Sequence, residues 1–215
     1  MVAALRSIAF WLVGIIVCFL IVSLSWNALS YFNFDSTYGF LRLKQAAVAT
    51  GIYLPAYYSH VLASGAILTL GFFQLNTRIS LKWRGLHRIV GKCYAYGILL
   101  FAAPGGLVMS FFIQRGPWVL VSFILQCTCW FIFTAIAVKK IRKHDIAEHR
   151  KWMLRSYALT FAAVTLRLYV FFLTSSYDLS QPEAYSIIAW MSWVLNLAVV
   201  EIYLMFFQKS ASSLR

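Results

Sequence analysis

Two histidines of this sequence have neighbours suited to holding a metal-containing group. His87 and His149 each begin a long apolar run, and each is followed directly by an arginine. Imidazoles at equal depth on two different helices can bind the two faces of a haem iron. Guanidinium groups pair well with the carboxylates of such a group. The pattern predicts a haem b site with His87 and His149 as iron ligands and with Arg88, Arg150 and Arg155 near the carboxylates.

The same residues also fit a purely structural role. A His-Arg pair at the end of a membrane helix often contacts lipid headgroups or fixes topology by its charge. A network of these histidines and arginines with Glu201 could equally lock three helices together, in the same layer as Gln74. His144, close to Asp145 and Glu148 in the sequence, is expected to belong to a solvated loop. Both interpretations of the layer remain open at this point.

A second polar layer is expected near the opposite surface. At 1.5 Å per residue, His60 lies roughly 6 Å below that surface, and Gln126 and Arg167 lie roughly 12 Å below it. An arginine at such depth is costly without a partner. We therefore expect Arg167 to bond His60 or Gln126, or the polar end of a bound anion, lipid headgroup or quinone. Together with Gln74 and Glu201, these three residues form the predicted ligand-binding set.

The helix that carries Arg167 is expected to face other helices along one stripe. Steps of three and four residues from His149 reach Met153, Ser156, Thr160, Ala163 and Arg167. A membrane helix has reason to keep polar and small side chains on one face where that face meets other helices or a bound group. The stripe is therefore predicted to point inward.

The composition is that of an integral membrane protein. Hydrophobic residues make up 62% of the 215 residues and charged residues 12%, about half the charged share of a soluble domain. The net charge of +13 does not indicate nucleic acid, because Lys and Arg lie at the ends of apolar runs. The four cysteines lack a zinc-site context and are expected to be buried. We predict one all-α membrane domain over 1–215, with six spans at about 8–29, 56–77, 89–113, 118–138, 153–175 and 184–207.

Basic residues are concentrated in two of the predicted loops. The loop after the second span includes Arg78, Lys82 and Arg84, and the loop after the fourth span is richer still, with Lys139, Lys140, Arg142, Lys143, Arg150 and Lys151. The positive-inside rule places both loops and both termini in the cytoplasm. In the external first loop, residues 38–44 could form a short helix on the membrane surface or cap an outward-facing cavity.

Several segments resemble one known family. HRKWMLRSYALTFAAVTLR at 149–167, HRIVGKCYAYG at 87–97, GFFQ at 71–74 after His60 and YGFLRLK at 38–44 are similar to the DUF2306 family of bacterial predicted membrane proteins. The resemblance covers about residues 38–170 and implies a multi-pass protein of the bacterial cytoplasmic (inner) membrane. The family name carries no activity, so the resemblance implies an architecture and not a function.

A second, partial resemblance concerns the two histidines. Their places at the starts of the third and fifth spans are similar to the cytochrome b561 arrangement. That likeness implies a central four-helix bundle of spans two to five, flanked by spans one and six, that holds two haems. The second haem of that superfamily takes histidines from helices two and four. Here His60 could serve in the second span, but the fourth span has no histidine.

Two classes of function follow. The first is a membrane electron-transfer protein, with haem b between the spans and a quinone or a redox partner protein near Arg167 and His60. The second is a non-redox binding or transport protein, in which Arg167 pairs an anionic headgroup or substrate. The segments that start at His87 and His149 are loosely alike, which suits paired ligands as well as an internal repeat. A hydrolase is not expected, because no Ser-His-Asp set or metal-spaced histidine cluster lies within one layer.

Overall fold

The computed structural model describes residues 2–75, 82–173 and 182–212, and every regular element in these ranges is helical. Six helices are long and apolar enough to cross a membrane, at Trp11–Asn33, Tyr53–Gln74, Arg84–Ser110, Pro117–Arg142, Ile146–Leu173 and Glu183–Phe206. They confirm the all-α fold class and the six predicted spans. The fifth begins at Ile146 rather than near Met153, because the charged stretch before the apolar run is already helical. Arg78 lies outside the described residues, as do residues 176–181 of the predicted external loop 176–183 between the fifth and sixth spans.

Five of the spans are continuous helices, and the third is composite. The continuous ones are α1 (Val2–Leu29), α3 (Tyr53–Gln74), α7 (Pro117–Arg142), α8 (Ile146–Leu173) and α9 (Pro182–Ser212). The third span joins α5 (Arg84–Gly97), the π-helical turn η3 (Ile98–Ala102) and α6 (Ala103–Ser110). Between α1 and α3 the chain forms the short helices η1 (Ser30–Asn33), η2 (Gly39–Lys44) and α2 (Gln45–Val48). The short helix predicted at 38–44 is therefore present.

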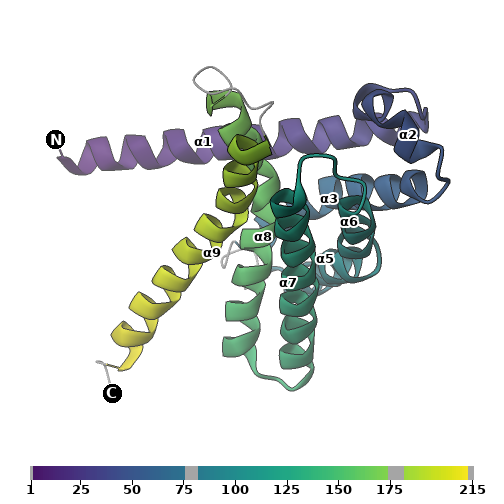
Figure 1. The fold of residues 1–215 in the computed structure, drawn as a ribbon. Coiled ribbons are helices and arrows are strands. Elements are labelled where there is room, and N and C mark those ends of the chain that lie inside the picture. The colour runs from purple at the N-terminus through teal and green to yellow at the C-terminus, as the bar shows by residue number, and fades with distance from the viewer. Residues whose placement is uncertain (1, 76–81, 174–181, 213–215) are drawn as a thin grey trace.

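The helices pack as two groups that meet at an angle. α7 and α8 lie side by side as an antiparallel pair with α9 along α8, whereas α1 runs across the direction of α8 (Figure 1). α3 packs on α1 and on the composite third span, and it contacts α8 over only a short stretch. The closed bundle of spans two to five, which the cytochrome b561 likeness implied, is not confirmed. Because α3 and α8 touch over only a short stretch, a cavity lies between them over the rest.

Buried hydroxyl groups hold the core where α5, α7 and α8 meet. The hydroxyl of Tyr94 lies 3.1 Å from Ser156 Oγ and 2.9 Å from Thr160 Oγ1. Trp130 Nε1 donates to Thr160 Oγ1 at 3.0 Å, and Thr134 Oγ1 lies 2.8 Å from Ser156 Oγ. Such bonds satisfy polar side chains that have no water to bind inside a membrane. Ser156 and Thr160 belong to the predicted stripe, so its inward direction is confirmed.

A tight turn sets the antiparallel pairing of α7 with α8. His144 is exposed, as predicted, and takes the left-handed conformation with φ of 59°. The Asp145 N–H donates to Lys140 O and the His144 N–H to Ile141 O, the bonding pattern of a Schellman motif. Asp145 then caps α8, because its Oδ1 accepts from the Glu148 N–H at 3.1 Å.

The composite third span is distorted at its proline. Pro104 has no N–H to donate, and the helix changes from α to π geometry in the turn before it. α3 bonds two carbonyls of this turn. Ser59 Oγ donates to Phe101 O at 3.0 Å, and His60 Nδ1 bonds Ala102 O at 2.6 Å. These two bonds fix α3 against the third span.

Candidate functional site

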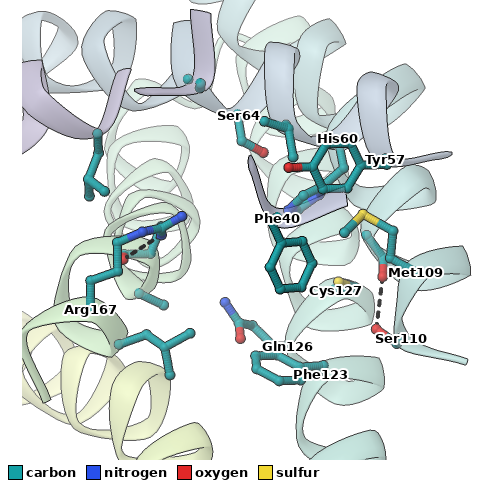
Figure 2. A pocket seen from close by; sticks show the side chains of 18 of the residues that line it. Phe40, Tyr57, His60, Ser64, Met109, Ser110, Phe123, Gln126, Cys127 and Arg167 are labelled. Atoms are coloured by element: carbon teal, nitrogen blue, oxygen red, sulfur yellow. Dashed lines mark hydrogen bonds between the residues drawn. The ribbon is translucent and has the colours of Figure 1, made fainter. Parts of the chain in front are cut away.

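A cavity of about 420 Å³ lies between α1, α3, α6, α7 and α8, beside the first loop (Figure 2). Phe40 and Lys44 of η2 line it. Between them, Leu41 is fully buried in a cluster with Tyr31 and Tyr57, which anchors η2 over the cavity. Residues 38–44 therefore cap a cavity, the second of the two roles predicted for them.

Arg167 extends from α8 into this cavity and faces the side that carries His60, Ser64 and Gln126 (Figure 2). Within the described residues, its Nη1 donates to Ala163 O of the same helix at 3.0 Å, and no hydrogen bond joins it to His60 or Gln126. The prediction of those two residues as direct partners is therefore wrong, because the three side chains line the cavity without reaching one another across it. Three phenols lie within electrostatic range of the guanidinium: Tyr31, Tyr57 and Tyr185.

The cavity is positively charged. Arg167 and Lys44 line it, and none of the described residues that line it is Asp or Glu. Lys44 Nζ donates to Phe112 O at 3.2 Å, which is a neutral acceptor. A cation in apolar surroundings is stabilised by an anion or by strong acceptors. The arrangement therefore suits the negatively charged end of a bound molecule.

His60 is held against two glycines of α6. A Cβ at Gly105 would lie 2.7 Å from Ala56 O, and a Cβ at Gly106 would lie 2.7 Å from His60 Nδ1. The ring also packs edge-on to Trp130, with 6.5 Å between centroids. Because Ala102 O can only accept, the Nδ1 of His60 carries the proton of their bond. In the neutral ring Nε2 is then an acceptor.

Gln126 and Ser64 add polar atoms without protein partners. Gln126 Nε2 donates weakly to Leu159 O at 3.5 Å, but its buried Oε1 has no partner among the described residues. Ser64 Oγ is also buried and unpaired in this part of the chain. Buried polar atoms are nearly always hydrogen-bonded in folded proteins. A bound molecule with a hydroxyl or N–H donor would satisfy Gln126 Oε1, and Ser64 could bind either a donor or an acceptor.

The arginines predicted around a haem make other contacts. Arg155 forms a two-pronged ion pair with Glu201 of α9, with N–O distances of 2.5 and 2.8 Å, and its guanidinium lies over the ring of Trp152. The pair links α8 to α9, which are two of the three helices in the predicted structural network. Arg88 and Arg150 are exposed, and Arg88 Nε contacts Arg84 O at 3.4 Å.

The two histidines of that layer are brought towards each other. His149 Nδ1 donates to Ala137 O of α7 at 2.8 Å, which orients its ring. His87 lies within electrostatic range of His149.

Gln74, at the end of α3, lies beside Gly91 of α5. A Cβ added at Gly91 would be 3.6 Å from Gln74 Oε1. The predicted polar residues therefore lie in two groups, one towards each end of the spans.

Comparison with known families decides the relationship of the chain. A family model described as predicted membrane protein (DUF2306) matches residues 57–204, which is more than half of the sequence. The chain belongs to the DUF2306 family. Comparisons with curated proteins and with solved structures gave no match. The DUF2306 region runs from α3 into α9, so it contains His60, Gln126 and Arg167 but not Lys44.

Several residues that build the cavity of this DUF2306 protein were not singled out from the sequence. They are Ser64, Gly105 and Gly106. The glycines had a signal, because Pro-Gly-Gly at 104–106 in the middle of an apolar run is unusual for a straight helix. Ser64 had none, because it reaches the cavity only through the packing of elements distant in sequence.

Proposed function

We propose that this protein is an integral membrane binding or transport protein whose cavity takes an amphipathic molecule with a negatively charged head. The observation that carries the proposal is the position of Arg167. It is a cation inside a membrane-spanning helix, and it faces a cavity to which the described residues contribute no carboxylate. Insertion scales put an arginine at the centre of a span at about 2.5–3.5 kcal/mol. A bound anion would offset that cost.

The cavity offers different surroundings to the two ends of such a molecule. The head meets Arg167 with its neighbouring phenols, and Lys44 adds a second cation from the cap. Apolar side chains form much of the remaining wall, including Leu24, Leu68 and Leu166. Mostly apolar pockets with a few placed polar groups are typical of sites for small organic ligands. An inorganic anion would use only the polar part, so an amphiphile is the better fit.

An isoprenoid quinone is the neutral alternative for the same space. Its carbonyl oxygens would accept hydrogen bonds from Arg167 and from Gln126 Nε2. Such a ligand would favour the electron-transfer class of function. The two classes of ligand differ in charge, which gives a direct test.

The test is titration calorimetry on the full chain purified in an uncharged detergent. Dodecyl phosphate, dodecanol and a short-chain ubiquinone analogue are compared as probes. We expect dodecyl phosphate to bind and dodecanol to bind much more weakly, because both share the chain and only one carries the charge. Equal binding of the two would overturn the proposal. Tight binding of the quinone analogue alone would replace it with the electron-transfer function.

Variants connect the binding to Arg167. Arg167→Leu should bind dodecyl phosphate about ten to a hundredfold more weakly, since hydrogen bonds to charged groups contribute about 1.5–3 kcal/mol. Arg150→Leu, an exposed arginine of the same helix, is the matched control and should leave binding unchanged. Arg167→Leu should also fold and insert, because leucine removes the desolvation cost. Unchanged affinity with lower thermal stability would assign Arg167 a purely structural role.

Haem b between His87 and His149 is the second candidate, and it stands on one observation. The Nδ1–H of His149 is bonded to Ala137 O, which leaves Nε2 free, as in many metal-bound histidines. His87 is within electrostatic range. Arg155 fits this candidate less well, because its two-pronged bond to Glu201 would have to break before it could pair a haem carboxylate. When bound, haem would supply one-electron transfer, and the histidines would hold it.

An absorption spectrum of the purified protein, oxidised and then reduced with dithionite, tests this candidate. Sharp reduced α and Soret bands, lost in both His87→Ala and His149→Ala and kept in the exposed control His144→Ala, would support it. A featureless spectrum in protein produced with sufficient haem, or equal haem content in both variants, would remove it.

A further inference from the structure

A second recess lies between the third span and α7, and it shares no lining residue with the cavity that holds Arg167. It has a volume of about 330 Å³. It is lined by Tyr96 and Leu99 of the third span, by Ala135, Val138, Lys139 and Arg142 of α7, and by Lys143 directly after α7. We call these seven residues the basic groove. Its apolar residues lie within the membrane-spanning part of both helices, and its three cations lie in the last turn of α7 and at the residue that follows it. One end of the groove is therefore apolar and the other is charged.

The charges of the groove are not neutralised by the acids nearby. Asp145 pairs with Lys140 at 3.3 Å, and Glu148 pairs with Lys151 at 2.7 Å. Neither of those lysines lines the groove. No carboxylate occurs among the described residues that do line it. The acids at this end of the α7–α8 hairpin thus offset the charge outside the groove and leave three cations inside it.

Arg142 is held in position over the groove. Its Nη2 donates to the hydroxyl oxygen of Tyr96 at 3.2 Å, which ties the end of α7 to α5. The phenol hydrogen of Tyr96 then stays available for another acceptor. A guanidinium with a fixed plane, a phenol donor and two flexible ammonium groups form a set of donors suited to a phosphate.

We propose that the basic groove binds an anionic phospholipid from the leaflet on this side of the membrane. The phosphate lies among Lys139, Arg142 and Lys143, and an acyl chain lies along Leu99, Ala135 and Val138. A soluble phosphate compound would leave the apolar half unused, and that half lies at a depth where lipid is the solvent. Basic clusters at the ends of membrane helices attract anionic lipids, because the lipid headgroups carry negative charge. The inference does not depend on the function proposed for the Arg167 cavity.

Native mass spectrometry of the full chain in an uncharged detergent tests this site. The probes are phosphatidylglycerol and phosphatidylcholine with identical acyl chains, and glycerol phosphate as the head alone. The groove variant replaces Lys139, Arg142 and Lys143 by glutamine. The control variant replaces Lys140, Arg150 and Lys151 by glutamine, an equal loss of charge on the same hairpin. Arg167→Leu is included in the background of both, so that lipid bound in the other cavity is not counted.

We expect phosphatidylglycerol to bind more tightly than phosphatidylcholine, and the groove variant to lose on the order of a hundredfold in affinity, about fivefold for each basic residue. The control should lose much less. Leu99→Trp, which fills the apolar half without changing charge, should weaken the lipid but not glycerol phosphate. Equal loss in the groove and control variants would reduce the effect to general charge and overturn the site. Competition by glycerol phosphate at the same concentration as the lipid would show a head-only site and overturn the assignment to a phospholipid.

Discussion

The imidazole of His60 packs directly on Gly106, with only 2.7 Å between its Nδ1 and the place where a Cβ at position 106 would lie. The same ring bonds Ala102 O through Nδ1, one turn earlier in the third span. The Nδ1 edge of the ring therefore makes both contacts, packing on the glycine and bonding a carbonyl of the π turn, and the two together fix the ring in one orientation. The space for His60 in the cavity wall is therefore made by α6.

Gly106→Ala should move His60 and lower stability. A methyl group at this position overlaps Nδ1 and Cε1 of the ring, and overpacking of this kind costs about 1–3 kcal/mol. Affinity for dodecyl phosphate should fall as well, because the ring shifts towards the cavity. Gly85→Ala is the matched control, since a Cβ there meets nothing within 4 Å, and alanine favours the helix. Thermal unfolding and calorimetry of the two variants give the comparison. Equal thermal stability of the two variants would mean that α6 moves to accommodate the added methyl group without loss of stability.

The parts of this fold that a sequence can predict are those set by local composition. The six spans follow from runs of apolar residues, and the inward stripe from Ser156 to Arg167 follows from helical spacing. The same reasoning correctly placed Arg155 and Glu201 in one layer, where they form an ion pair. Depth along a helix and position around its axis are both fixed by counting residues.

The partner of Arg167 could not be found in this way. Counting gives the depth of His60 and Gln126 but not the distance across the space between helices, and the three residues line a cavity instead of bonding. Burial of all four cysteines was also predicted from composition, yet Cys18 and Cys93 are exposed on the outer surfaces of their helices. An apolar run does not reveal which of its sides faces lipid, because both sides are apolar.

The α7–α8 turn should show a pH dependence through Asp145. The hydrogen bond from the Glu148 N–H, aided by Lys140, holds the pKa of the Asp145 carboxyl below its ordinary value. A lowered pKa in the folded state contributes stability at pH values above the unfolded pKa, and this contribution is lost as pH falls through the folded pKa. Asp145→Ala should therefore lower Tm at pH 7, and the difference from the unchanged chain should shrink below pH 4. A difference in Tm that stays constant across this range would assign the effect to packing.

Orientation in the membrane should follow the basic loops. We expect Lys143, in the α7–α8 turn, to be cytoplasmic, and Gln114, between α6 and α7, to be external, with both termini cytoplasmic. Green fluorescent protein fused after Lys143 should fluoresce, and alkaline phosphatase fused after Gln114 should be active. The reverse result would place the Arg167 cavity on the cytoplasmic side and the basic groove on the outer side.

The last prediction concerns Arg155 and Glu201, which join α8 to α9 through two charge-assisted hydrogen bonds near one end of the spans. A double-mutant cycle with Arg155→Leu and Glu201→Leu should give a coupling energy of about 1.5–3 kcal/mol in thermal or denaturant unfolding. Each single change leaves a charge without its partner, and the double change removes both. The double variant should therefore be more stable than the sum of the single losses predicts.

The chain supplies its own control for this cycle. Lys151 and Glu148 form an ion pair three residues apart on α8, at the edge of the spans, and their coupling should be no more than about 0.5 kcal/mol. If the two cycles gave equal coupling, the Arg155–Glu201 pair would be no more than a surface contact. Arg155 would then be free to leave Glu201 at little cost, and the main objection to its pairing with a haem carboxylate would disappear. A large coupling energy would show that Arg155 stabilises the packing of α9 against α8 through Glu201.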